Sequence, residues 1–155
     1  GGKRVFVTSA LLSGGFGGQT AADLRCQLLA DNARLGGRFI AWVSVVGTPA
    51  LARVQGNGPW FLVDRRTRVF ASKAAITTVM PEVPIDRDET GKRVDQSLVW
   101  TGTTAAGTAS VQNCLNFTAE IGAGAVGEAD KKDAKWTESG ITDCATRLHL
   151  YCIEQ

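Results

Sequence analysis

Residues 146–153, TRLHLYCI, are the stretch that decides the fold. Side chains alternate between two types along it, which is typical of a strand whose successive residues point to opposite faces. The two faces of the predicted strand are Leu148, Leu150 and Cys152 on one side, and Arg147, His149 and Tyr151 on the other. The chain therefore ends on an apolar strand that carries a cysteine.

Cys152 is one of four cysteines, with Cys26, Cys114 and Cys144. Their spacing suits a nested pair of disulfides, Cys26–Cys152 outside and Cys114–Cys144 inside, but four cysteines allow three pairings and the spacing leaves them open. Disulfides persist in oxidising compartments, so we expect a secreted or cell-surface protein. The alternative is four buried thiols in a cytosolic protein. Zinc is disfavoured because no C-x-x-C or Cys/His cluster has ligand spacing.

Length and composition indicate one globular domain, residues 1–155. Hydrophobic residues make up 44% of the chain and charged residues 21%, which is ordinary for a globular protein. A net charge of +2 is too small to indicate a nucleic-acid partner. No apolar run approaches the length of a membrane span, so none is expected. The sequence opens without a signal segment, so export would require a signal or lipid anchor outside it.

The pattern along the chain predicts an α+β domain whose two ends meet. A helix is expected to begin with Thr20 as its cap and to end at the pair Gly36-Gly37. The segment 83–95 reads as a loop, and 103–143 shows little periodicity, so we expect a long loop lobe pinned by an inner disulfide. The remaining predicted elements are strands at 3–12, 39–46, 97–102 and 146–153, a hairpin of 60–63 with 68–70, and a short helix at 48–54 opened by Thr48-Pro49.

Several short segments and single residues follow one another along the chain in a characteristic order. They are RVFVTS at 4–9, GG at 17–18, AD at 22–23, AWVS at 41–44, DETG at 88–91, VWTGT at 99–103 and LYCIEQ at 150–155, with Cys26, Cys114, Trp136 and Cys144. This ordered set resembles the endostatin-like branch of the C-type-lectin-like fold, as in bacterial extracellular domains that include the leptospiral endostatin-like surface adhesins.

The resemblance implies a small twisted antiparallel sheet, two helices, a long irregular loop lobe and the nested disulfide pairing. It also implies a binding module at a cell surface or in extracellular matrix, with adhesion as its role. A fold alone does not determine a function.

A basic cluster on the predicted hairpin is the first candidate site: Arg65, Arg66, Arg68 and Lys73. Endostatin-like relatives hold sulfated polysaccharides on arginine surfaces, and guanidinium groups suit two-point contacts with sulfate. The resemblance therefore predicts these four residues as ligand-binding. The alternative is an ordinary charged hairpin tip, partly offset by Asp64.

An acidic cluster on the 83–95 loop is the second candidate: Asp86, Asp88, Glu89 and Asp95. Carboxylates gathered on a loop are suited to calcium, and D-x-D-x-T-G opens like a calcium loop. However, Ser97 stands where such a loop needs a glutamate. The triplets Glu82-Val83-Pro84 and Trp136-Thr137-Glu138 also depart from those of sugar-binding C-type lectins. The alternative is that these carboxylates are solvated or paired with Arg87, Lys92 and Arg93.

Signals for an enzyme are weak. No G-x-S-x-G elbow is present, and His149, the one histidine, has no obvious cysteine or serine partner. We predict a non-catalytic module that binds extracellular macromolecules, either matrix or host proteins or sulfated polysaccharide. The alternatives are a structural cell-envelope domain with no soluble ligand and a calcium-dependent carbohydrate lectin.

Overall fold

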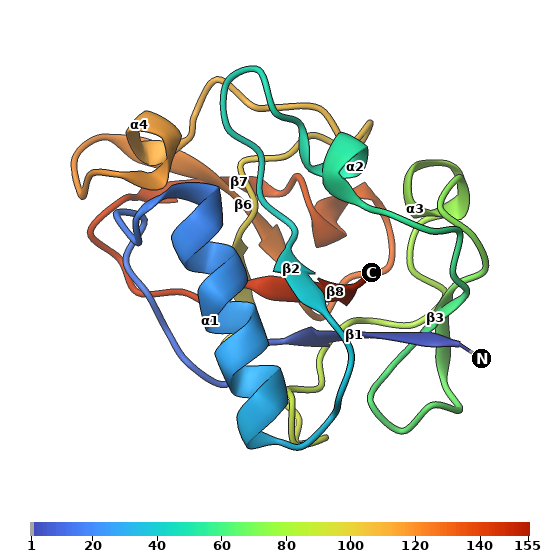
Figure 1. Cartoon of the computed structure of the whole chain (residues 1–155). Helices are drawn as coiled ribbons and strands as arrows, with labels where there is room; N and C mark the ends of the chain where they lie inside the picture. The colour runs from blue at the N-terminus through green and yellow to red at the C-terminus, as the bar shows by residue number, and fades with distance from the viewer. Residues whose placement is uncertain (1) are drawn as a thin grey trace.

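The computed structural model describes residues 2–155. Figure 1 shows a long helix, α1, packed beside a sheet, with short helices and irregular segments around them. The elements are β1 (Lys3–Val7), α1 (Gly18–Asn32), β2 (Phe39–Ala41), α2 (Ala50–Arg53), β3 (Trp60–Phe61), β4 (Arg68–Phe70), α3 (Ala75–Thr78), β5 (Leu98–Trp100), α4 (Cys114–Phe117), β6 (Ala123–Glu128), the 3-10 turn η1 (Ala134–Trp136), β7 (Gly140–Asp143) and β8 (Tyr151–Glu154).

The larger sheet joins the two ends of the chain. Its strand order is β2-β8-β1-β3-β4, with β8 antiparallel to both β1 and β2. This confirms the prediction of an α+β protein whose first and last strands meet. The resemblance implies an antiparallel sheet. This part of the prediction is wrong for one strand pair, because β1 and β3 run parallel. The predicted β3–β4 hairpin is present.

Both faces of residues 148–153 are buried. Leu148, Leu150 and Cys152 lie in one hydrophobic cluster, and Tyr151 lies in another on the opposite face. From Leu148 onward the alternation therefore separates two halves of the core rather than core from solvent, whereas Arg147 is exposed. Regular strand pairing covers Tyr151–Glu154 only, and Leu148 joins Leu12 in an isolated bridge.

Helix α1 buries small residues against the sheet. Ala22, Cys26 and Ala30 are its buried side chains, and Cys26 is bonded to Cys152 with a Cα–Cα distance of 5.5 Å. The second disulfide, Cys114–Cys144, has a Cα–Cα distance of 5.7 Å. The nested pairing is thus confirmed. The predicted cap at Thr20 is wrong, because the helix begins after Gly17 and no side chain caps it. Gly17 has a φ of 106°, a left-handed conformation that glycine adopts without strain.

The predicted loop at 103–143 is wrong in part, because it contains two strands. β6 pairs with β5 and β7 in an antiparallel three-stranded sheet. Glycines in β6 hide the apolar alternation, and close packing requires them. A Cβ at Gly127 would lie 2.0 Å from the carbonyl oxygen of Trp136, and one at Gly124 would lie 2.6 Å from Cys114 Sγ.

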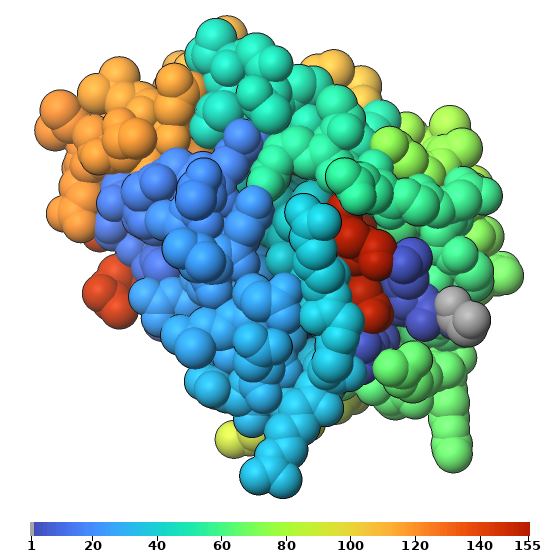
Figure 2. Space-filling view, viewed as in Figure 1, coloured from blue at the N-terminus to red at the C-terminus, as the bar shows by residue number. Residues whose placement is uncertain are grey.

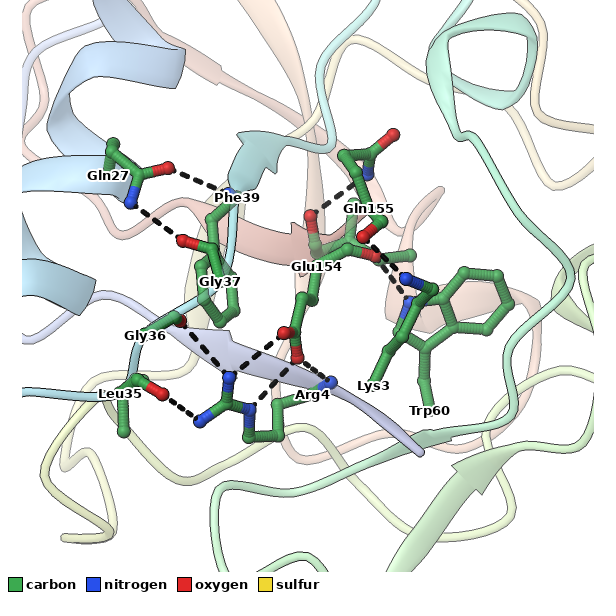
Figure 3. Close-up of polar contacts among 11 residues, drawn as sticks. Lys3, Arg4, Gln27, Leu35, Gly36, Gly37, Phe39, Trp60, Glu154 and Gln155 are labelled. Atoms are coloured by element: carbon green, nitrogen blue, oxygen red, sulfur yellow. Dashed lines mark hydrogen bonds and ion pairs between the residues drawn. The ribbon is translucent and has the colours of Figure 1, made fainter. Parts of the chain in front are cut away.

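A buried ion pair joins β1 to β8 (Figure 3). Arg4 is 3% exposed, and its Nε and Nη2 each lie 2.9 Å from a carboxylate oxygen of Glu154. The guanidinium also donates to the carbonyls of Leu35 (2.6 Å) and Gly36 (3.1 Å). Gly37 leaves room for the carboxylate, since a Cβ there would lie 2.2 Å from Glu154 Oε2. Each guanidinium nitrogen of Arg4 and each carboxylate oxygen of Glu154 therefore has a partner.

Tyr151 carries a polar group into the core. Its ring packs against Trp136 at a centroid distance of 5.4 Å, and its hydroxyl donates to the Trp136 carbonyl at 2.7 Å. Burial, with smaller contributions from the charges of Asp130 and Glu128, holds the pKa of Tyr151 well above its ordinary value of 10.0. The phenol stays protonated in the folded protein under conditions where an unfolded chain loses that proton.

This difference makes stability fall in alkali. The folded-state pKa is raised, so the contribution is complete below pH 10 and is lost as the pH rises further. Above pH 10 the unfolded state binds one proton fewer at Tyr151, and the free energy of unfolding falls by about 1.4 kcal/mol per pH unit from this group. Denaturant unfolding of Tyr151→Phe at pH 9 to 11 should show a shallower decline than the parent chain. Equal slopes would contradict this assignment.

Candidate binding site between the hairpin and the 83–95 loop

The turn of the β3–β4 hairpin is built around Asp64. Its Oδ1 accepts the backbone N–H groups of Arg66 (2.8 Å) and Thr67 (2.9 Å), and its Oδ2 accepts the Thr67 hydroxyl (2.7 Å). The hydrogen bonds from the Thr67 backbone, the Thr67 hydroxyl and the Arg66 backbone lower the pKa of Asp64. The carboxylate is therefore occupied by the turn itself.

The four basic residues predicted to bind ligand fall into two groups. Arg68 pairs with Glu82 at 2.8 Å, and this hydrogen bond raises the pKa of Arg68. Lys73 Nζ donates to the Val54 carbonyl at 2.6 Å. Arg65 and Arg66 are exposed, and within residues 2–155 no carboxylate lies at ion-pair distance from either. The structure thus leaves two of the four cations free for a ligand.

The acidic residues of the loop are mostly committed to the fold. Asp88 is 6% exposed, and its Oδ1 accepts three hydrogen bonds, from the Thr90 backbone, the Thr90 hydroxyl and the Lys92 backbone. Glu89, also 6% exposed, accepts the backbone N–H and the hydroxyl of Ser9. Their role is to hold the loop in shape and to fasten it to the end of β1.

Asp86 and Asp95 do not complete a calcium site with them. Asp86 lies between Arg87 (3.7 Å) and Arg93 (3.3 Å), and Asp95 is exposed. Across residues 2–155, no group of three or more acidic, histidine or cysteine side chains is arranged to hold a metal ion. The geometry therefore favours the alternative reading, in which these carboxylates serve the loop and its basic neighbours.

A cavity of about 420 Å³ lies where the hairpin meets the loop. We call it the hairpin–loop cavity. Its charged lining residues are Asp64 from the turn and Asp86, Arg87 and Arg93 from the loop. Its apolar lining residues are Leu62, Val63, Val83 and Pro84. In Figure 2 the green segment that contains the hairpin lies on the right of the surface, away from the blue α1.

The electrostatic balance of this region is positive. The hydrogen bonds on Asp64 come from uncharged groups and leave its negative charge in place. The arginines of the turn and of the cavity wall, Arg65, Arg66, Arg87 and Arg93, nevertheless outnumber the carboxylates Asp64 and Asp86. The sequence offers no sign that Arg87 and Arg93 belong with the hairpin, because they lie in a separate loop that follows α3. From the sequence they are expected only as counter-ions of the acidic loop.

Comparison with protein-family models and with curated protein sequences gave no match for this chain. Among residues 2–155, no helix is long and apolar enough to cross a membrane.

Proposed function

We propose that this chain is a non-catalytic, extracellular or cell-surface binding module that holds sulfated polysaccharide across the hairpin turn and the adjoining hairpin–loop cavity. The observation that carries the proposal is the exposure of Arg65 and Arg66 without acidic partners, on a turn whose own carboxylate is already occupied. Two disulfides support an oxidising location.

The chemistry of the site suits an extended anionic chain. Guanidinium groups bind sulfate through two parallel hydrogen bonds. Arg87 and Arg93 line the cavity, and Arg65 and Arg66 are exposed between Asp64 and Thr67, the two residues of the turn that line it. A polymer lying along the hairpin would place one sulfate at the turn and a neighbouring group over the cavity. Apolar residues at its wall suit the C–H face of a sugar ring.

The fold assignment is a proposal of the same kind. We propose a C-type-lectin-like fold of the endostatin-like branch. The nested disulfides, the pairing of the first and last strands, and the helix bonded to the last strand support it. The binding role proposed for the hairpin stands on the contacts above and not on this assignment.

Replacing both free arginines, as Arg65→Ala/Arg66→Ala, is expected to weaken binding to heparin by roughly tenfold or more at low salt, because two charge-assisted contacts are lost. The measurement is equilibrium affinity at two ionic strengths. The matched control is Arg25→Ala/Lys132→Ala, which removes the same charge from exposed positions outside the site.

Equal losses in the two double variants would show that net charge, not this site, governs binding. Loss of binding in a chelator would favour a calcium-dependent lectin. No binding at any ionic strength, in the presence or absence of calcium, would favour a structural envelope domain.

A further inference from the structure

The two sheets of the described chain have four outer strands, β2, β4, β5 and β7. An outer strand whose backbone groups are unpaired is a template for pairing with another chain, which is why proteins usually cover such edges. On β2, the backbone N–H groups of Phe39 and Ala41 donate to the side chains of Gln27 (2.9 Å) and Asp23 (2.9 Å). Side chains of helix α1 therefore close this edge.

The outer strands β4 and β5 are covered by backbone segments. The Val69 carbonyl of β4 accepts the backbone N–H of Glu82 at 2.9 Å. Beside β5, the Trp100 N–H donates to the His149 carbonyl at 3.0 Å, and the His149 N–H donates to the Leu98 carbonyl at 3.3 Å. Both edges therefore already use outward backbone groups inside the protein.

The fourth outer strand, β7, is open at its centre. Ile141 lies opposite Ala125 of β6. Ala125 directs its backbone away from β7, because its N–H donates to the Gln112 carbonyl at 2.8 Å and its carbonyl accepts the Thr101 N–H at 3.2 Å. Two opposite residues of an antiparallel pair either both bond to each other or both point outward, so the N–H and carbonyl of Ile141 face away from β6. Within residues 2–155, neither group has a hydrogen-bond partner.

Strand β7 also lacks the features that usually block pairing at an edge. Its sequence, GITD, contains no lysine and no proline, and its register with β6 is unbroken. Ile141 is 60% exposed, although it is the large apolar residue of the strand. The one charge, on Asp143, lies at the end of the strand. The open edge is therefore short, largely uncharged and apolar at its centre.

We propose that β7 pairs with β7 of a second copy of this chain, antiparallel and across a two-fold axis at Ile141. The two Ile141 residues exchange their free backbone hydrogen bonds, and their side chains meet on one face of a continuous sheet. Thr142 then lies opposite Gly140 of the other copy, and Asp143 lies opposite Ser139, so no like charges are opposed. A second copy fits better than an unrelated strand because this one register covers both open edges at once.

This interface goes beyond the proposed function and does not depend on it. No residue of β7 lines the hairpin–loop cavity, and the test needs no ligand. The strand has four residues, so the area that it can bury is small, and a reversible dimer is expected rather than an obligate one.

Sedimentation equilibrium of the chain at concentrations up to about 1 mM is expected to show a reversible equilibrium between monomer and dimer. In parallel, hydrogen exchange at the Ile141 amide should slow as the protein concentration rises, because this N–H is paired only in the dimer. A chain that stays monomeric over the whole range would overturn the proposal. So would a dimer in which exchange at Ile141 does not depend on concentration.

Two variants at one position test the interface. Ile141→Lys should weaken the dimer about tenfold, because two like charges replace an apolar pair at the axis. Ile141→Pro removes the outward N–H and should also weaken the dimer, and an edge strand tolerates proline where that N–H makes no internal bond.

The matched control is Leu24→Lys on α1, where the side chain is 67% exposed, and it should leave the dimer unchanged. Thermal unfolding in dilute solution checks that each variant monomer is folded. A dimer that is as stable in both Ile141 variants as in the parent, or one that Leu24→Lys weakens equally, would place the interface elsewhere and overturn the proposal.

Discussion

Removing the outer disulfide, as Cys26→Ala/Cys152→Ala, is expected to lower the free energy of unfolding by roughly 4 kcal/mol, the scale for a bond that closes a long loop. The two cysteines are 126 residues apart in sequence, and both are fully buried. The bond fastens α1 to β8, so its loss also loosens the helix from the sheet. Alanine is the replacement of choice because serine would bury a hydroxyl.

The inner disulfide supplies the matched comparison. Cys114 and Cys144 are only 30 residues apart, so the loop-entropy contribution of their bond is smaller by about 1 kcal/mol. Denaturant unfolding followed by tryptophan fluorescence measures both double variants. If Cys114→Ala/Cys144→Ala lost more stability than Cys26→Ala/Cys152→Ala, the inferred dominance of the outer bond would be wrong.

Neutralising Glu154, as Glu154→Gln, is expected to destabilise the chain by about 3 kcal/mol or more, the scale for leaving a buried charge without its partner. Arg4 would keep its contacts to the Leu35 and Gly36 carbonyls but would lose both charged contacts to the carboxylate. The same carboxylate accepts the Arg4 backbone N–H at 2.7 Å, so the β1–β8 pairing also weakens.

The control is the exposed pair Arg68–Glu82, where Glu82→Gln should have a small effect because solvent screens it. The double variant Arg4→Met/Glu154→Met should recover much of the loss, since it leaves no charge unpaired. A Glu154→Gln protein as stable as the parent in thermal and denaturant unfolding would contradict the structural role of this pair.

Several elements of the fold could be predicted from local sequence patterns. Residues 3–12 and 146–153 are predicted as strands because β-branched and apolar residues are dense there, and the structure pairs Lys3–Val7 and Tyr151–Glu154 of these segments. The β3–β4 hairpin is predicted from two short apolar runs. The strands β6 and β7 were missed because Gly124 and Gly127 remove apolar side chains from β6 at the places where Cys114 and Trp136 pack. From sequence alone, glycine favours a loop. The close contacts with Cys114 and Trp136 in the folded chain explain why β6 requires glycine at these two positions.

In the candidate sites, too, clusters of residues could be predicted from the sequence, but their long-range partners could not. The hairpin arginines could be singled out from their clustering, but the roles of individual members could not. Arg68 meets Glu82 at a separation of 14 residues, and Glu89 meets Ser9 at a separation of 80. The acidic cluster looked like a cation site because the internal partners of Asp88 and Glu89 are set by the fold. No sequence pattern distinguishes His149, because its unusual feature is a buried ring nitrogen without a hydrogen-bond partner in the described chain, and the fold determines that feature.

The central claim is that an anionic polysaccharide binds at the hairpin–loop cavity. The most direct test is amide NMR mapping of the intact chain with a short heparin oligosaccharide, at low and high salt, in calcium and in chelator. Our account predicts shifts concentrated at Arg65, Arg66, Arg87 and Arg93, which weaken with salt and are unchanged by chelator. Shifts spread over all exposed basic residues, or centred away from the hairpin, would contradict it.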